Sequence, residues 1–252
     1  DHGTSRGLGD VYKRQESWFW RNLVSKEMKI NAAKEAISFV KDGMNLGLGT
    51  GSTVDEFLIL LSKEIKNGLN ICGVPTSEKT RDLSNKLSIP LTTLESVKKL
   101  DLTIDGADEI DNELSLIKGG GGALLREKII AFNSDELLII ADESKLVDKL
   151  GDFKLPIEVS PYEHEVTSLR IINKLNKIGY EGTIDLRKDD KNIFITDGGN
   201  YIYDLSVGLI SDPNIVEQTL NLIPGVFENG LFIGLTKKVV IGGQEGTRII
   251  SK

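Results

Sequence analysis

Cysteine and histidine are scarce in this sequence, and their scarcity narrows the chemistry that the chain can perform. The 252 residues contain one cysteine, Cys72, and two histidines, His2 and His164. A single cysteine cannot form an intramolecular disulfide, and no cysteine cluster offers a zinc site. The two histidines lie far apart in the sequence, which argues against a histidine-based metal site or a Ser-His-Asp triad. Any catalysis must therefore come from carboxylates, lysines, hydroxyl groups and the backbone.

A basic excess and long apolar runs are also missing. Lys and Arg number 31 against 38 Asp and Glu, a net charge of −7, whereas non-specific nucleic-acid binding needs a basic surface. A locally positive pocket for phosphate stays compatible with this charge. No apolar run is long enough to span a membrane, and the N-terminus lacks the apolar core of a signal peptide. We expect a cytoplasmic protein with no nucleic-acid partner and no membrane partner.

The first stretch, DHGTSRGLGDVYKRQESWFW, differs from the rest of the chain. It has no amphipathic period and contains both tryptophans. We interpret residues 1–22 as a non-native or disordered extension, such as a tag, a cloning remnant or misread upstream sequence. The remainder has an ordinary globular composition, with 39% hydrophobic and 27% charged residues over the whole sequence.

Strand-like apolar runs alternate with helical patterns up to about residue 145. We expect strands at MNLGLG, NICGV, PLTTL, LDLTID and ELLIIAD, with amphipathic helices between most of them. ELLIIAD is almost continuously apolar, which is typical of a central parallel strand. The alternation predicts an α/β fold with a Rossmann-like, doubly wound, mainly parallel sheet.

The pattern changes after residue 154. The order strand, helix, two strands, helix, strand predicts a smaller ferredoxin-like α+β domain over residues 155–233. The tail KKVVIGGQEGTRIISK resembles a hairpin, which we expect to return to the main sheet. The predicted catalytic α/β domain therefore comprises residues 23–154 and 234–252.

Three polar motifs each follow directly on a predicted strand. They are TGST, DGADE and ADESK. In doubly wound sheets, ligands bind beyond the carboxyl ends of the strands. We therefore expect all three motifs on one rim of the sheet.

The motif GLGTGST, residues 47–53, lies between a predicted strand and a predicted helix. Backbone N–H groups at a helix N-terminus favour anions, and Ser52 and Thr53 add hydroxyl donors. No lysine follows the glycines as in a Walker A motif, and the spacing of the dinucleotide fingerprint is incomplete. A tight turn with a Ser/Thr helix cap remains an equally good interpretation of this motif alone.

The motif DGADEID places Asp105 and Asp108 at a strand end. Turn chemistry alone explains such residues, and a calcium loop is a further alternative. The calcium loop needs a glutamate at its twelfth position, and counting from Asp105 that position is Leu116, so this alternative fails. Two nearby carboxylates could instead accept hydroxyl protons or orient a sugar.

The motif KGGGG, from Lys118 to Gly122, combines one cation with freely rotating backbone. A flexible linker is the alternative, although a helical pattern begins immediately after it. Glu127 follows on that helix, and considered alone it reads as a solvated residue between Arg126 and Lys128. Lys145 has the same status, and His164 reads as a structural or exposed residue of the second domain.

Together the motifs resemble a known family. GLGTGST, TIDGADEID, KGGGGALLREKI and ADESK, in this order, are similar to those of ribose-5-phosphate isomerases of the A type. The resemblance extends from about Ala33 to the C-terminus. It implies an enzyme that interconverts ribose 5-phosphate and ribulose 5-phosphate without a metal or an organic cofactor, and a homodimer or higher homo-oligomer. Independently of the resemblance, we expect the second domain to contribute to the interface.

The resemblance also implies roles for residues that match the motifs. Glu127 would be the general base, and Asp105 would assist ring opening. Lys118, with backbone N–H groups of the glycine run, would stabilise the enediolate oxygen. Asp108 would hold hydroxyl groups and the hydrogen bonds of the site. The implied substrate contacts are Thr50, Gly51, Ser52, Thr53, Asp105, Gly106, Ala107, Asp108, Lys118, Gly119, Gly120, Gly121 and Lys145. The resemblance does not divide the phosphate among Ser52, Thr53, Lys145 and lysines of the first helix such as Lys29.

One departure from the family pattern is a fourth glycine, Gly122, which we expect to be tolerated at a helix start.

Three other functions compete with the isomerase. A sugar-phosphate sensor would usually add a DNA-binding domain and lose the base, whereas Glu127 is present. An amino-sugar-phosphate deaminase would normally use a histidine in its site. An acyl-CoA transferase would need a differently placed glutamate.

Overall fold

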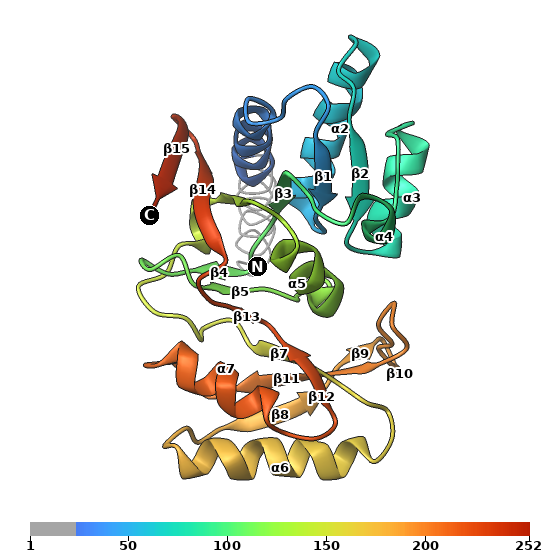
Figure 1. Cartoon of the computed structure of the whole chain (residues 1–252). Helices are drawn as coiled ribbons and strands as arrows, with labels where there is room; N and C mark the ends of the chain where they lie inside the picture. Colours follow the sequence, from blue (N-terminus) through green and yellow to red (C-terminus); the bar gives the residue numbers. More distant parts are fainter. Residues whose placement is uncertain (1–23) are drawn as a thin grey trace, which may run out of the picture.

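The computed structural model describes residues 24–252, so the expected extension at residues 1–22 lies outside the described part of the chain. The described chain forms one unit around a six-stranded sheet and a second unit around a four-stranded sheet (Figure 1). No helix among residues 24–252 combines the length and the apolar character needed to cross a bilayer.

The larger sheet has the strand order β15-β14-β6-β3-β1-β2. All neighbouring pairs are parallel except β14 and β15, which form the predicted C-terminal hairpin at the sheet edge. The apolar β6 is a central strand, as its sequence predicts. The mainly parallel Rossmann-like sheet is thus confirmed. Its strands are β1 (Asn45–Leu48), β2 (Cys72–Pro75), β3 (Leu102–Asp105), β6 (Leu137–Asp142), β14 (Thr236–Gly243) and β15 (Gly246–Ser251).

Helices cover both faces of this sheet. The helix at residues 24–37 and α2 (Ser52–Lys66) bury apolar side chains such as Phe57 against one face. α3 (Glu78–Lys86) packs beside α2, and α5 (Leu124–Phe132) covers the opposite face. Alternate residues of β6 face the two layers, which is why this strand is apolar throughout.

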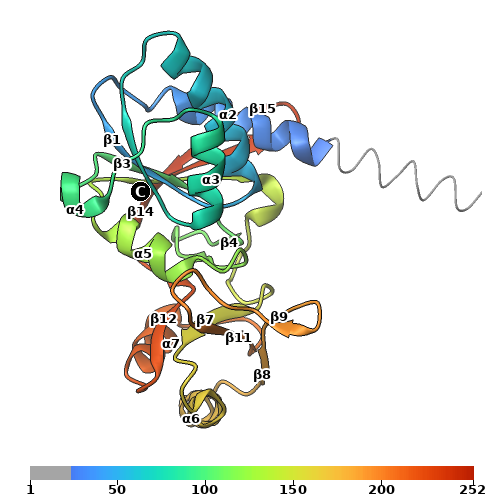
Figure 2. The same cartoon turned by 90° about the vertical axis from the view of Figure 1, so that its right-hand side faces the viewer.

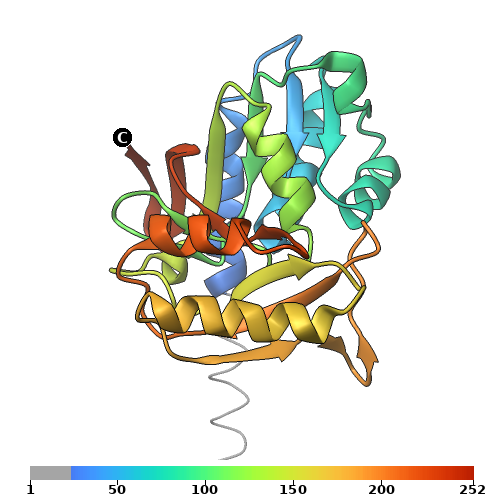
Figure 3. The same cartoon turned by 60° about the horizontal axis from the view of Figure 1, so that its bottom comes forward.

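The second unit has the ferredoxin-like order that the sequence predicts. Its antiparallel sheet runs β12-β7-β11-β8, and α6 and α7 lie side by side across it (Figure 3). A small hairpin of β9 (Lys188–Asp189) and β10 (Asn192–Ile193) projects from it. The remaining elements are β7 (Leu155–Val159), α6 (His164–Lys177), β8 (Thr183–Leu186), β11 (Tyr201–Ser206), α7 (Pro213–Asn221) and β12 (Val226–Asn229).

A third sheet, which the sequence patterns do not predict, lies between the two units (Figures 1 and 2). It joins β4 (Glu109–Ile110), β5 (Leu116–Ile117) and β13 (Leu231–Phe232) in the order β13-β5-β4. β13 follows β12 directly and pairs with β5, so the chain leaves the second unit beside the KGGGG motif. Each of these strands has two residues, which is too short to show an alternating hydrophobic pattern in the sequence.

The strand expected at PLTTL is wrong. Leu91 makes only a single bridge to Gly73, and the short helix α4 (Leu94–Val97) begins three residues later. The Thr93 hydroxyl accepts a hydrogen bond from the backbone N–H of Ser96, so this threonine caps a helix rather than extending a strand.

Candidate active site

A cavity of about 160 Å³ lies at the carboxyl ends of β1, β3 and β6. Its lining includes every predicted site residue except Asp105, which lies directly beneath it in contact with Lys118. The lining also includes Lys29, Ala141 and Asp142. The three polar motifs therefore meet on one rim, as the strand-end rule predicts.

Three buried charged side chains meet at one side of the cavity. Lys118 Nζ lies 3.0 Å from Asp105 Oδ2 and 3.4 Å from Glu127 Oε2. Each of these side chains is at most 4% exposed. Lys118 donates its hydrogen bond to the backbone oxygen of Gly106 at 2.6 Å, and neither carboxylate oxygen accepts a hydrogen bond from a described residue. Among the described residues, these two buried oxygens are therefore balanced only by the charge of the Lys118 ammonium.

Asp105 is fixed by the backbone around it. Its Oδ1 accepts hydrogen bonds from the N–H groups of Thr50 at 3.0 Å and Gly106 at 2.8 Å. A Cβ on Gly49 would lie 2.2 Å from the same oxygen, so only glycine allows β1 to approach Asp105 this closely. The first glycine motif therefore places the carboxylate as well as the cavity wall.

The protonation of Glu127 and Lys118 is set by burial and by their mutual proximity. Burial raises the pKa of Glu127 to about 8, against the lowering effect of Lys118 and with a further rise from Asp105. Burial by itself lowers the pKa of Lys118, but the carboxylates of Asp105, Glu127 and Asp108 outweigh it and raise that pKa above its usual value. The site thus holds a permanent cation beside a carboxyl group that can exchange a proton near neutral pH.

Glu127 is buried because its helix faces the sheet while its charged neighbours turn away. Arg126 Nη1 donates to Glu78 Oε1 at 2.7 Å, and Lys128 Nζ donates to Glu228 Oε1 at 2.8 Å. Glu127 is 3% exposed. The interpretation of Glu127 as a solvated residue is therefore wrong, and its place at the cavity agrees with the family resemblance.

Asp108 and the glycine run form the neighbouring wall. The Gly120 N–H donates to Asp108 Oδ2 at 2.8 Å. Gly119 has φ +99° and Gly122 has φ +80°, a conformation that side chains disfavour. Gly122 is therefore required where the sequence suggested only that it is tolerated, because a Cβ there would also lie 2.3 Å from the Phe194 ring.

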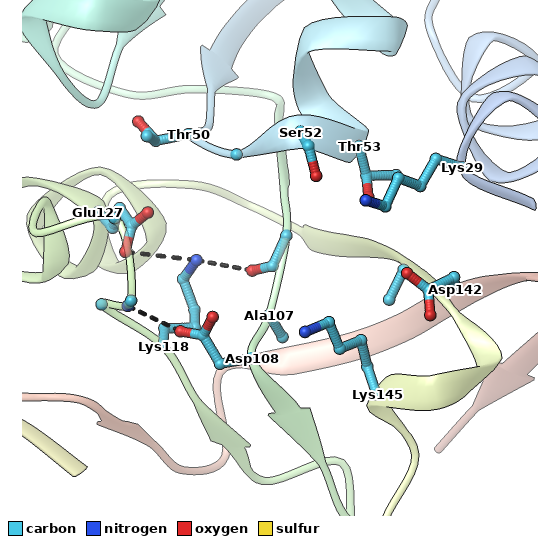
Figure 4. Close-up of a pocket in the computed structure, with 16 residues that line it drawn as sticks. Lys29, Thr50, Ser52, Thr53, Ala107, Asp108, Lys118, Glu127, Asp142 and Lys145 are labelled. Carbon is cyan, nitrogen blue, oxygen red and sulfur yellow. Dashed lines mark hydrogen bonds and ion pairs between the residues drawn. The ribbon is translucent and has the colours of Figure 1, made fainter. Parts of the chain in front are cut away.

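The hydroxyl groups of the loop between β1 and α2 have two different roles. One bonds with other residues of the protein, and the others face the cavity. The Thr50 hydroxyl bonds with the hydroxyls of Thr76 at 2.8 Å and Ser77 at 2.7 Å, so this side chain braces the loop. Ser52 and Thr53 begin α2 with no side-chain cap, and their hydroxyls face the cavity (Figure 4). The start of α2 leaves backbone N–H groups without helical partners at this wall.

Two lysines stand at the far side of the cavity from Glu127 and Lys118 (Figure 4). Lys29 comes from the first helix and Lys145 from η1 (Glu143–Lys145). Neither forms an ion pair with a residue in the 24–252 range. With the start of α2 they make this end of the cavity suited to a doubly charged anion.

Asp142 is a cavity residue that the sequence reasoning missed. It ends β6, is 3% exposed and caps η1 by accepting a hydrogen bond from the Ser144 N–H at 3.1 Å. The signal that found Asp105, a carboxylate at the end of an apolar strand, applies equally to Asp142. By holding η1, Asp142 places Lys145 at the cavity.

His164 lies away from the cavity, at the start of α6, where Nδ1 is 2.8 Å from the Tyr203 hydroxyl. The histidine expected of a deaminase is therefore not among the residues that line the site. Among the described residues, no group of three or more His, Cys, Asp or Glu side chains is placed to hold a metal ion. The carboxylates of the cavity gather around the Lys118 ammonium instead.

Comparisons with known proteins agree with this geometry. Residues 72–246 match the family model "Ribose 5-phosphate isomerase A (phosphoriboisomerase A)". The ribose-5-phosphate isomerase A of Brucella suis is 53% identical over 228 residues, which cover 90% of this chain and 98% of that protein.

Solved structures show the same relationship. Ribose 5-phosphate isomerase A from Methanocaldococcus jannaschii superposes with a TM-score of 0.82 at 42% identity, covering 90% of this chain and all of the other. A D-ribose-5-phosphate isomerase in complex with phospho-erythronic acid gives a TM-score of 0.85 at 41% identity, covering 90% and 99%. The chain described here belongs to the ribose 5-phosphate isomerase A family.

Proposed function

We propose that this chain interconverts D-ribose 5-phosphate and D-ribulose 5-phosphate, a step of the non-oxidative branch of the pentose phosphate pathway. The observation that carries the proposal is the buried pair of Glu127 and Lys118, 3.4 Å apart at the wall of the cavity. Moving a proton between adjacent carbons needs a base that can take and return it, next to a charge that stabilises the oxyanion formed in between.

The proposed reaction begins from the open-chain aldose. Glu127 removes the proton from C2, and the electrons pass through the new C1–C2 double bond to the C1 oxygen. The Lys118 ammonium stabilises the resulting enediolate. The C1 oxygen then takes up a proton as the C2 oxygen gives one up, and Glu127 returns its proton to C1. The sum is an aldose converted into a ketose, with no net gain or loss of protons.

Asp105 and Asp108 are assigned to the hydroxyl protons. Asp105 Oδ2 lies 3.0 Å from Lys118 Nζ and accepts no hydrogen bond from a described residue. Its proposed task is to assist opening of the furanose ring and to pass protons between sugar oxygens. Asp108 is held by the Gly120 N–H and is assigned to orienting the sugar hydroxyls.

The phosphate is assigned to the end of the cavity formed by Lys29, Lys145 and the start of α2. This end offers two cations and uncapped backbone donors, and it is opposite Glu127 and Lys118 (Figure 4). The relative solved with phospho-erythronic acid supports a site for a ligand that combines a phosphate with a carboxylate. A carboxylate mimics the charge of an enediolate at the reacting end.

Conversion of ribose 5-phosphate to ribulose 5-phosphate, measured in EDTA with the intact chain and with Glu127→Gln, tests the proposal. We expect the variant to lose about two to four orders of magnitude in kcat while it still binds substrate. Glu95→Gln, at an exposed position on α4, is the matched control and should keep full activity. Equal activity in Glu127→Gln and the intact chain would remove Glu127 from the role of base.

Two further assignments accompany the reaction. We propose a homodimer, supported by large apolar side chains that the second unit leaves exposed, among them Tyr162 at 81%, Leu169 at 64% and Leu222 at 82%. We also place the enzyme in the cytoplasm, in keeping with a single free cysteine and a substrate of central metabolism.

A further inference from the structure

The glycine run at the cavity is held from outside by an arginine of the second unit. Arg187 directly follows β8, and its Nη1 donates to the backbone oxygens of Gly119 at 2.8 Å and Gly120 at 3.2 Å. Arg187 does not line the cavity, and the proposed chemistry gives it no part. It is far from the four sequence motifs, and no local pattern marks it.

Arg187 is itself rigidly placed. Its Nε donates to Asp204 Oδ2 at 2.9 Å, and its Nη2 forms an ion pair with the other oxygen of that carboxylate. The backbone N–H of Arg187 donates to Ile202 O at 2.8 Å, so the residue after β8 stays paired with β11, the strand that carries Asp204. The two side chains are only 14% and 18% exposed. A bidentate and largely buried ion pair of this kind holds its geometry well.

Arg187 and Asp108 bind the same peptide unit of the glycine run from two sides. The oxygen of Gly119 and the N–H of Gly120 are opposite ends of one peptide unit. Arg187 holds the oxygen, and Asp108 Oδ2 accepts from the N–H at 2.8 Å. In the next unit, Arg187 holds the Gly120 oxygen, so the Gly121 N–H must point the opposite way.

Gly121 lines the cavity, and its N–H donates to no residue in the described part of the chain. Without a side chain, the run from Gly119 to Gly122 has more conformational freedom than any other tetrapeptide would have. A donor on such a segment keeps its direction only if the surrounding structure imposes it. Arg187 and Asp108 are the side chains that do so here.

We propose that Arg187 is a positioning residue for the isomerisation: from the second unit it fixes the glycine run so that the Gly121 N–H, beside Lys118, faces the oxygen that becomes negative in the enediolate. This inference rests on the proposed function. A preorganised donor stabilises the transition state more than the bound sugar, because the charge on that oxygen develops only during reaction. The effect of Arg187 therefore falls on kcat more than on KM.

The test compares Arg187→Met with Arg187→Lys and with Lys154→Met. Methionine keeps much of the packing of the side chain but removes all donors, and lysine keeps the charge without the fork that links Asp204 to the two glycine carbonyls. Lys154→Met is the matched control, since it breaks the neighbouring ion pair with Asp185, 2.9 Å long, without touching the glycine run. For each variant, kcat and KM for ribose 5-phosphate are measured, with inhibition constants for phospho-erythronic acid and inorganic phosphate.

For Arg187→Met we expect kcat to fall by roughly 10- to 100-fold and KM to change by less than about threefold. Phospho-erythronic acid should bind more weakly by at least about fivefold, whereas inorganic phosphate, held at the opposite end, should bind as before. Arg187→Lys should recover part of the loss, and Lys154→Met should behave as the intact chain. An unchanged kcat in Arg187→Met, or an equal loss of affinity for inorganic phosphate, would overturn the inference.

Asp204→Asn serves if Arg187→Met does not fold. It leaves Arg187 in place but weakens its anchor, and the expected fall in kcat is about three- to tenfold, again with phosphate inhibition unchanged. No fall in kcat would overturn the inference in this variant too. If the intact chain itself shows no isomerisation, the proposed function fails, and the role of Arg187 is then decided by phospho-erythronic acid binding alone.

Discussion

Glu127 shows how burial changes what a side chain does. In water a glutamate is almost fully ionised at neutral pH and is a weak base. Here burial raises its pKa to about 8, although Lys118 beside it favours the ionised form. A base with a pKa near the working pH takes a proton from carbon more effectively and still releases it in the next step. The same two residues at the surface would form an ordinary, weak ion pair.

The pH dependence of kcat/KM follows from this raised pKa. Because kcat/KM reports ionisation of the free enzyme and the base must be ionised, it should rise with pH and level off above about 8. The second ionisation of the substrate phosphate, near about pH 6, lies well below this midpoint. Initial rates at low substrate concentration, from about pH 6 to about pH 9.5, measure the curve.

Asp108→Asn is the matched variant for this curve. The Asp108 charge contributes to the raised pKa of Glu127, so its removal should shift the midpoint toward acid, whatever it does to the maximal rate. A midpoint that stays in place, or a profile of the intact chain that is flat across this range, would contradict the assignment of Glu127.

Among the structural elements, the glycine run is the one whose backbone conformation sets where α5 begins and therefore where Glu127 lies. It lies between β5 and the start of α5, and Arg187 of the second unit binds its backbone from the side away from the cavity. Gly122 ends it with φ +80° against the Phe194 ring. The fourth glycine thus lets α5 begin at the angle that brings Glu127 to the cavity.

Gly122→Ala should destabilise the protein by about 2 to 4 kcal/mol, since it combines a disfavoured φ with a Cβ only 2.3 Å from Phe194 Cζ. Gly121→Ala is the control for stability, because its nearest neighbour would be Thr50 Cγ2 at 3.6 Å and its φ is not positive. The free energy of unfolding in urea gives both values. Phe194→Ala should restore part of the stability of Gly122→Ala but not of Gly121→Ala, and additive losses would show that the two positions do not collide.

At the level of the whole molecule, the cavity depends on contacts between the two units. Arg126 of α5 joins Glu78 of α3 to Asp197 of the second unit, with distances of 2.7 Å to Glu78 Oε1 and 3.0 Å to the Asp197 backbone oxygen. Lys128 binds Glu228 of β12 at 2.8 Å. The helix that carries Glu127 is therefore fixed on both sides by residues distant in the sequence. The second unit is part of the active site's support as well as a proposed surface for assembly.

The proposed homodimer predicts a mass of about twice 27.7 kDa by light scattering at working concentration. Leu222→Asp, at a position 82% exposed in the second unit, should shift the protein toward the monomer. Ile249→Asp, at a 48% exposed position on the edge strand β15, should not. A monomeric mass for the intact chain would rule out the dimer, and dissociation by Ile249→Asp alone would move the interface to the larger unit.

Particular elements show which parts of the fold could be predicted from the sequence. The apolar run of β6, the helical period of α5 and the hairpin of β14 and β15 were each predictable, because their patterns repeat over six residues or more. The small sheet of β4, β5 and β13 was not, since its strands are two residues long and pair across the chain. The strand expected at PLTTL failed because a single threonine cap outweighed its weak strand pattern.

The sequence by itself determined that three polar motifs meet at one rim, because the carboxyl ends of parallel strands share an edge. With the KGGGG motif, it also indicated most of the residues that line the cavity, although not Asp142. Only the tertiary structure decided what each group can do there: that Glu127 is buried beside Lys118, that the Thr50 hydroxyl turns away, and that Arg187 grips the glycine run. The reason is physical, because desolvation and hydrogen-bond direction depend on neighbours that are remote in the chain and leave no local pattern.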